Sequence, residues 1–486
     1  MKKFLYFITT IGFLVLLLAI YAFVSFKPPK PAQPLSDRFV LQNITIVHPG
    51  EEQRTEGNLA VADGRFTEDT LSEATTFDDF NGCYVLPGLV DMHAHLPGET
   101  PLKLGDYFML LHIAHGVTAI RGAGDTDGTA NPGLKAAMES GELFGPRLYT
   151  SGYFVASEEV RWTNTLLMEG PEDAEKIVQQ IADEGNQFIK AYENLKPEMI
   201  KALVAEAEKR DMGVLGHIPF ELTIEEAMVP DIQHLMGVVK PEDISEDSIL
   251  ARISEWDSVD ETRLDSVTKF CQENDLANTP TLALGSHILR YRDYANVIKE
   301  PDVQLLPPFY SEIVWHPEEG LPLYRGMTNE DFDRLEDAVA KKQTLVKKLH
   351  DAGAQLYLGT DTQQPFSVPG AGLHTEIHAF LDAGVPLEDT LRYATTASYE
   401  ALPGEKKLGR VEPGFLADAV VYREDPTKSP DALKSIVAVI VDGNLFRKSD
   451  LDKKIQEYQD FYRGALVARV SETVARGALE DSVAGQ

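Results

Sequence analysis

The chain has 486 residues, 43% of them hydrophobic and 25% charged, which is ordinary for globular proteins and enough to bury a core without disulfides. Length alone suggests two or three domains, or one large barrel with an appendage. The net charge of −32 repels phosphate backbones, so we expect no nucleic-acid partner. The 2 cysteines, Cys83 and Cys271, exclude a cysteine-rich zinc site, so any metal must be bound by histidine, carboxylate or lysine side chains.

An uncharged apolar run, Phe4–Phe26, follows Lys2 and Lys3 at the start of the chain. As a helix it is long enough to cross the roughly 30 Å hydrocarbon core of a bilayer. The exit Val24-Ser25-Phe26 is bulky for a signal-peptide cleavage site, so we expect an uncleaved membrane anchor, with a cleaved secretory signal as the alternative. The N-terminal lysines favour a body on the extracytoplasmic, periplasmic side of the membrane.

A proline-rich linker at residues 27–37 leads into segments with different patterns. Short alternating runs at 38–83 predict strands separated by turns. From 84 to 404, apolar strands alternate with helical stretches, which is typical of βα units around a parallel sheet. Strand patterns return at 405–449, and 450–486 has helical spacing. We therefore expect an α/β protein, a (β/α)8 TIM barrel inserted into a small β-sandwich domain formed by both flanks, with an N-terminal membrane helix and a C-terminal helical tail.

The chemistry begins at His93 and His95, which end an apolar run that starts at Val85. Side chains at i and i+2 of a strand point to the same face, so these two imidazoles can bind one cation. Further candidates end later apolar strands, where the active sites of barrels lie. They are Lys190, His217, His234 and Asp361. Each alone has a structural explanation, such as a core histidine or a helix N-cap, but together they predict a metal site at the barrel mouth.

With these residues in place, the chain resembles the amidohydrolase superfamily in its binuclear, carboxylated-lysine form. Three further segments carry the resemblance: His374–Glu376, Ala394–Ala397 and Leu408–Asp418. It extends over residues 39–446 and is nearest to the imidazolonepropionase-like hydrolases and the Xaa-Pro dipeptidases. It implies an enzyme that hydrolyses a C–N bond of a small molecule, in an amide, a dipeptide or a cyclic amide, with a metal-activated hydroxide.

The resemblance also implies two divalent metal ions, for which zinc suits the donors and manganese, cobalt and iron are alternatives. The implied ligands are His93, His95 and Asp361 for one ion, and His217 and His234 for the other, with Lys190 bridging both as a carbamate formed from carbon dioxide. The carbamate is physically reasonable because an ammonium beside two dications is strongly disfavoured. Asp361 would also be catalytic, moving a proton from the water to the leaving nitrogen.

Candidates for substrate contacts rest on weaker patterns. Arg121 and Tyr192 follow strands and are candidates for binding an anionic group. His287 and His374 are placed near the mouth. An insertion rich in tyrosine, at residues 285–329, separates the last two barrel strands and is a candidate cover for the site.

Two alternatives stay open at this stage. One is a deaminase-type, lactone-hydrolysing or ester-hydrolysing member of the same superfamily; the mononuclear deaminase would not need Lys190. The other is an anchored binding protein without catalysis. The dipeptidase branch often has a tyrosine where this chain has Pro219, so the natural substrate is left open, as is homo-oligomerisation.

Overall fold

The computed structural model describes residues 25–51, 54–68, 73–160, 162–245, 249–404 and 406–484. The apolar run Phe4–Phe26 lies almost wholly outside these ranges, so the membrane anchor stays a prediction. Within the described ranges, no helix combines the length and the apolar character that a bilayer crossing requires.

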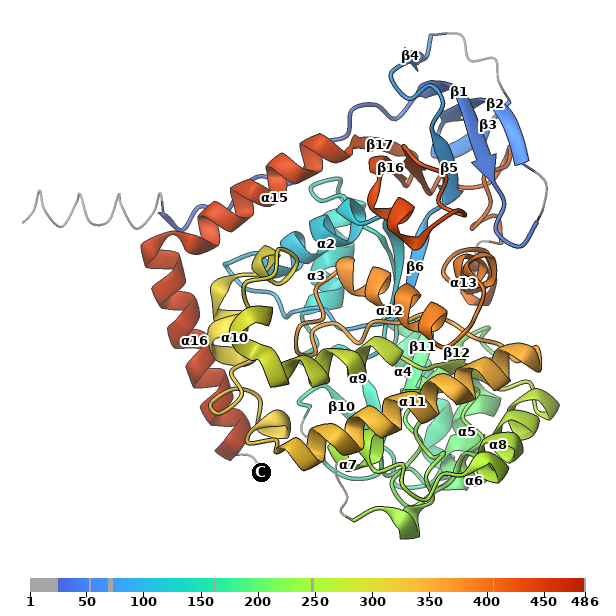
Figure 1. Cartoon of the computed structure of the whole chain (residues 1–486), viewed down its shortest axis with the longest axis vertical. Helices are drawn as coiled ribbons and strands as arrows, with labels where there is room; N and C mark the ends of the chain where they lie inside the picture. Colours follow the sequence, from blue (N-terminus) through green and yellow to red (C-terminus); the bar gives the residue numbers. More distant parts are fainter. Residues whose placement is uncertain are drawn as a thin grey trace, which may run out of the picture.

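A sheet made from both flanks of the chain lies at one end of the molecule (Figure 1). Its strand order is β17-β16-β15-β5-β1-β2-β3, with β4 paired to β1. The strands of this flank sheet are β1 (Phe39–Val47), β2 (Arg54–Ala62), β3 (Arg65–Thr67), β4 (Thr75–Phe77), β5 (Tyr84–Pro87), β15 (Ala419–Tyr422), β16 (Ile436–Val441) and β17 (Asn444–Arg447). The antiparallel pair β5 and β15 joins the flanks, with Val85 opposite Val421. Residues 84–87 thus lie in the flank sheet, and the first barrel strand begins at Leu89.

Parallel strands fill the segment between the flanks. They are β6 (Leu89–Ala94), β7 (Val117–Gly122), β8 (Arg147–Thr150), β9 (Phe154–Ala156), β11 (Phe188–Ala191), β12 (Gly213–Gly216), β13 (Asp231–Gln233) and β14 (Ala277–Thr279), with the short β10 (Thr165–Leu167) beside β9. The ring is closed in two places. The backbone N–H of Gln187, just before β11, donates to the carbonyl of Thr150 of β8 at 2.9 Å. The extended segment 356–362 joins the other ends, because Leu356 bridges Asn278 of β14 and Thr362 bridges Ala94 of β6. This closed arrangement is consistent with the expected TIM-barrel-like α/β domain.

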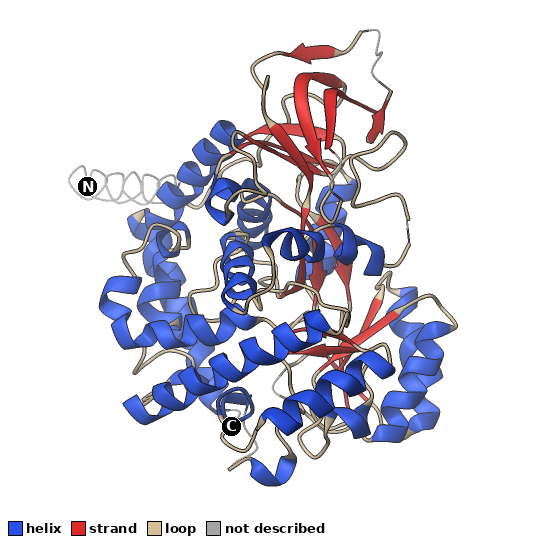
Figure 2. Cartoon of the chain, turned by 45° about the vertical axis from the view of Figure 1, so that its right-hand side comes forward, coloured by secondary structure: helices blue, strands red, loops and turns tan. Residues whose placement is uncertain are grey.

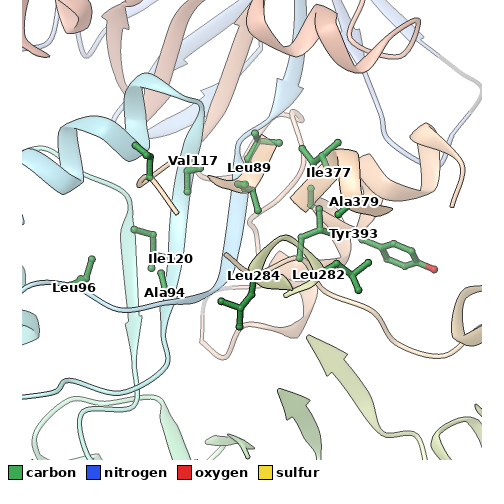
Figure 3. Packing of buried hydrophobic residues seen from close by; sticks show 14 of the residues in the cluster. Leu89, Ala94, Leu96, Val117, Ile120, Leu282, Leu284, Ile377, Ala379 and Tyr393 are labelled. Carbon is green, nitrogen blue, oxygen red and sulfur yellow. The ribbon is translucent and has the colours of Figure 1, made fainter. Parts of the chain in front are cut away.

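Helices surround the barrel strands (Figure 2). They are α2 (Leu104–Ala114), α3 (Ala130–Glu139), α4 (Ala174–Asp183), α5 (Pro197–Glu208), α6 (Ile224–Ala227), α7 (Ile249–Ser254), α8 (Glu261–Glu273), α9 (Leu282–Leu289), α10 (Tyr294–Val297), α11 (Asn329–Asp351), α12 (Ala371–Asp382), α13 (Leu387–Tyr393) and α14 (Thr396–Ala401). Apolar side chains of strands and helices share one buried cluster, in which Leu89 of β6 and Val117 of β7 gather with Ile377 of α12 (Figure 3). Burial of this apolar area is the main force that holds the helices on the barrel.

The C-terminal helices α15 (Lys448–Arg463) and α16 (Ala465–Ala484) pack on the barrel domain and on the insertion. The ring of Tyr458 stacks on Tyr107 of α2, with 5.0 Å between the ring centroids. On α16, Leu479 joins Ile313 of the insertion in a small apolar cluster. The insertion itself is built from short helical turns and includes a π-helical turn at Tyr310–Val314.

Two local features of the barrel position the site. The pairing of β6 with β7 shifts register between Asp91 and Ala94, so that Met92 and the following His93 both face the barrel interior. Opposite this irregularity, a Cβ atom on Gly359 would lie only 2.6 Å from the Cβ atom of His93. Glycine at position 359 therefore lets the closing segment approach the first histidine of the site.

Candidate metal centre

Side chains from the carboxyl ends of several barrel strands meet at one point, which we call the ligand cluster. Its members are His93, His95, Lys190, His217, His234 and Asp361. All are buried except His95, whose side chain is 19% exposed. The most accessible face of the cluster is therefore the His95 side.

One half of the cluster could hold a metal ion directly. The Nε2 atoms of His93 and His95 each lie 3.4 Å from Oδ1 of Asp361. The possible ligand atoms of the three residues all lie within 4.8 Å of one another. Two imidazoles and a carboxylate form a donor set that suits zinc and related divalent cations.

The other half follows directly around the barrel. The ring of His234 lies 4.6 Å from that of His93 and 5.0 Å from that of His217, measured between centroids. Nδ1 of His234 is 3.9 Å from Oδ2 of Asp361, so the carboxylate faces both halves. Lys190, at the end of β11, is near enough to lower the pKa values of both His93 and His234 electrostatically.

The histidines of the cluster are oriented by hydrogen bonds at Nδ1. His93 is bonded to Oε1 of Gln233 at 2.5 Å, and His95 to the carbonyl of Gly124 at 3.2 Å. His234 and His217 make the corresponding contacts with Thr281 Oγ1 (2.7 Å) and Glu193 Oε1 (3.2 Å). Such partners fix ring orientation and leave Nε2 for a metal.

The same residues fit a metal in a second way. Nε2 of His93 and Nζ of Lys190 are buried and have no hydrogen-bond partner among the described residues. Buried polar atoms without partners are costly, and a cation or a cation-bound group would satisfy both.

Burial governs the electrostatics of the cluster. It lowers the pKa of His93 to about 4, which keeps the imidazole neutral and able to donate a lone pair. It also lowers the pKa of Lys190 to about 7. Burial alone would raise the pKa of Asp361, but the neighbouring imidazoles, His234 first and then His93 and His95, hold it well below its usual value. Asp361 is therefore ionised at neutral pH.

The backbone at and next to the cluster is left-handed at several residues. His234 and Asp361 have positive φ angles of 61° and 53°, as do the neighbouring Leu235 and Thr281, at 57° and 47°. Aspartate and histidine adopt this region more readily than most residues, whereas Leu235 and Thr281 adopt it reluctantly, and such strain gathers at functional sites.

The weaker candidates lie in different surroundings. Arg121 is buried and makes an ion pair with Asp231, with 2.6 Å between Nη1 and Oδ2. Tyr192 lies beside the cluster, with its ring 4.8 Å from that of His217 and its hydroxyl accepting a hydrogen bond from Trp162.

The two remaining histidine candidates are on helices. His287, on α9, is buried, and burial lowers its pKa to about 3. His374, on α12, donates from Nε2 to the carbonyl of His115 at 2.9 Å. None of the described contacts joins either residue to the ligand cluster.

Sequence reasoning missed the residues that orient the cluster. Gln233 and Glu193 are each close in sequence to a ligand, but a polar residue near a strand end carries no signal of its partner. Thr281 belongs to a strand end distant in the chain from His234. The insertion was recognised, and its Tyr310 and Tyr324 bond Gln363 and Gln364, in the loop that follows Asp361, at 2.7 and 2.8 Å.

A family model described as "Amidohydrolase family" matches residues 84–446. Among solved structures, the chain is similar to a putative prolidase from Bifidobacterium longum, with a TM-score of 0.61 and 22% identity over 88% of this chain and 100% of that one. It is also similar to a bottromycin amidohydrolase, with a TM-score of 0.66 and 23% identity over 89% of this chain and 94% of that one. At these identities the likeness to solved structures establishes the fold.

A curated relative matches a short part of the chain. An adenine deaminase from Nitratidesulfovibrio vulgaris (strain Hildenborough) is 37% identical over 81 residues. The match spans 17% of this chain and 14% of the deaminase.

Proposed function

The chain belongs to the amidohydrolase family, and on that premise we propose that it hydrolyses a C–N bond of a small molecule with two divalent cations, preferably zinc, held by the ligand cluster. The observation that carries the proposal is the convergence of His93, His95 and Asp361, with the metal-facing Nε2 of His93 buried and without a hydrogen-bond partner among the described residues. A purely structural cluster would satisfy that atom within the protein.

In this proposal Lys190, once converted to a carbamate, would help to hold both cations. Only a neutral amine attacks carbon dioxide, forming an N–C bond and releasing one proton. Burial supplies that form, because it lowers the pKa of Lys190 to about 7. The product is a carboxylate in a position where an ammonium and two dications would repel each other.

The cations, when bound, would lower the pKa of water and polarise the carbonyl of the substrate. Asp361 supplies the proton transfer: held ionised by its histidine neighbours, it can accept a proton from water and deliver it to the leaving nitrogen. The low exposure of the cluster keeps bulk water away from these charges.

For the substrate we propose an amide, a dipeptide or a cyclic amide. The guanidinium of Arg121 already forms an ion pair with Asp231. Pro219 occupies the position where the dipeptidase branch often has a tyrosine. These two observations favour a neutral or cyclic amide over a dipeptide whose carboxylate needs a partner.

A deaminase is the second candidate, favoured by the short match to adenine deaminase. A mononuclear deaminase would not need the bridge from Lys190 and would release ammonia rather than a larger amine.

The test is metal analysis of the purified protein together with an activity screen on dipeptides, N-acyl amino acids, lactams, lactones and aminopurines. We expect about two metal ions per chain and hydrolysis of an amide or lactam. Release of ammonia from an aminopurine would favour the deaminase. Fewer than one metal per chain with no hydrolysis in any panel would instead favour a binding protein.

We further propose that residues 4–26 anchor the protein in a membrane with its acidic body outside the cytoplasm. N-terminal sequencing of native protein from the membrane fraction tests this. A sequence beginning near Lys27 would show a cleaved signal instead.

A further inference from the structure

A buried polar chain inside the barrel connects Arg121 to the ligand cluster. Nη1 of Arg121 binds Oδ2 of Asp231 at 2.6 Å. The Nε2 atom of Gln233 donates to Oδ1 of Asp231 at 2.8 Å and to its backbone carbonyl at 3.1 Å. Oε1 of Gln233 then meets Nδ1 of His93 at 2.5 Å. All four side chains are buried.

This connection decides which nitrogen of His93 carries the proton. Asp231 offers Gln233 two acceptors, so the amide must turn its NH2 group toward Asp231 and its oxygen toward His93. An oxygen there accepts, so Nδ1 of His93 is the donor. The lone pair of the neutral imidazole is thereby on Nε2, which faces Asp361 across 3.4 Å.

Arg121 supports the arrangement from both sides. Its Nε donates to the carbonyl of Met92 at 2.8 Å, one residue before His93. Thr279 donates to Asp231 at 3.0 Å and accepts from Nη2 of Arg121 at 3.1 Å. The guanidinium therefore neutralises Asp231 and at the same time holds the strand that carries His93.

We propose that Arg121, Asp231 and Gln233 form a positioning relay that orients His93 and fixes its metal-binding tautomer. The relay rests on the proposed metal site and assigns Arg121 to positioning rather than to the substrate. Gln233 sets the tautomer without adding a second negative charge beside Asp361, as a carboxylate in its place would.

The decisive variant is Gln233→Leu, which keeps the approximate size but removes the hydrogen bonds to Asp231 and to His93. Asn278→Leu is the matched control, since Asn278 is also a buried amide on a barrel strand but donates to the carbonyl of Leu276. Full-length protein in mild detergent is stripped of metal and titrated with Zn²⁺ against a chelator, and with Co²⁺ to record its visible spectrum. Thermal unfolding of the metal-free proteins measures the structural cost.

We expect Gln233→Leu to bind its tightest metal about 10- to 100-fold more weakly, with an altered Co²⁺ spectrum. Asn278→Leu should bind like wild type even though its metal-free unfolding temperature falls by a similar amount. If Gln233→Leu does not fold, Gln233→Met, which has an unbranched side chain, takes its place.

Wild-type affinity in Gln233→Leu, or an equal loss in Asn278→Leu, would overturn the relay while leaving the metal site intact. A wild-type protein that binds no metal would overturn the proposed function, and the relay with it.

Discussion

The flank sheet and the barrel mouth use left-handed backbone in opposite ways. In the flank sheet and its turns, positive φ occurs at Asn43, Asp63, Asp442 and glycines, residues that adopt it at little cost, and otherwise at Glu73. At the mouth it occurs at His234, Leu235, Thr281, Asp361 and Phe366, most of which resist it. In the flank sheet, most residues with left-handed backbone are types that favour it. At the mouth, the surrounding structure holds less suitable residues in that conformation.

Burial shows the same contrast. The apolar cluster of the flank sheet includes Val421 and Ile440, and the buried carboxylate beside it, Asp418, is paired with Arg147. The mouth buries Lys190, Asp361 and several histidines, which cost desolvation energy. If the mouth holds the chemistry, as proposed, and the flank sheet contributes mainly stability, substitutions in the two regions should have separable effects.

The largest expected effect is a loss of turnover, which should distinguish two buried aspartates, one at the mouth and one beside the flank sheet. Asp361→Asn should lower turnover by several orders of magnitude, because it removes a proposed metal ligand and the proposed proton carrier. The fold should persist, since asparagine accepts the left-handed backbone at this position. Asp418→Asn is the control: Asp418 pairs with Arg147 at 2.6 Å next to the flank sheet, so its loss should reduce stability and spare turnover. Turnover and thermal unfolding, measured for both variants, test this prediction. Wild-type turnover in Asp361→Asn would refute the mechanism.

The next largest effect is expected from a comparison of alanine substitutions at two buried lysines. Lys190→Ala should lose the bridge and lower activity at least about a hundredfold, and a short carboxylic acid in the buffer should restore part of it. Lys342, on α11, is also buried and has a pKa lowered to about 7, but it lies over the ring of Trp256. Lys342→Ala should therefore keep its metal. Full activity of Lys190→Ala would point to the mononuclear deaminase.

Formation of the carbamate should depend on pH in a direction set by burial. Burial favours the neutral amine and lowers the pKa of Lys190 to about 7, so the reactive form falls about tenfold per pH unit below 7 and dominates above it. In metal-free protein at fixed dissolved carbon dioxide, the rate of carbamate formation should rise up to about pH 7 and then level off. Carbon-13 NMR with labelled bicarbonate measures it; a rise continuing toward pH 10 would indicate an ordinary, exposed lysine.

The smallest effect concerns the flank sheet alone. Ile440→Val removes one buried methylene group from β16 and should lower the free energy of unfolding by about 1 kcal/mol. Zinc affinity should stay at the wild-type value, which a chelator titration would check alongside chemical denaturation. A clear loss of zinc binding would show that the two regions are coupled.

The positions of the candidate ligands could be predicted because the signals are local. An apolar run that ends in His93-Ala94-His95, or in Asp361, indicates a buried strand and the side chain that follows it. Parallel strands of a barrel then place such ends on one face. The mixture of strand and helix patterns indicated the class of fold for the same reason.

Only the tertiary structure decided how those ligands are held. The register shift between Asp91 and Ala94 and the positive φ of His234 depend on neighbouring strands. The partner of Arg121 lies on a different strand, and no sequence pattern around Arg121 reveals that its guanidinium forms an ion pair with Asp231. The sequence by itself therefore determined which chemical groups reach the mouth, because periodicity and residue type act over a few residues. Tautomers, orientations and charge partners were decided by contacts between strands that are distant in the chain.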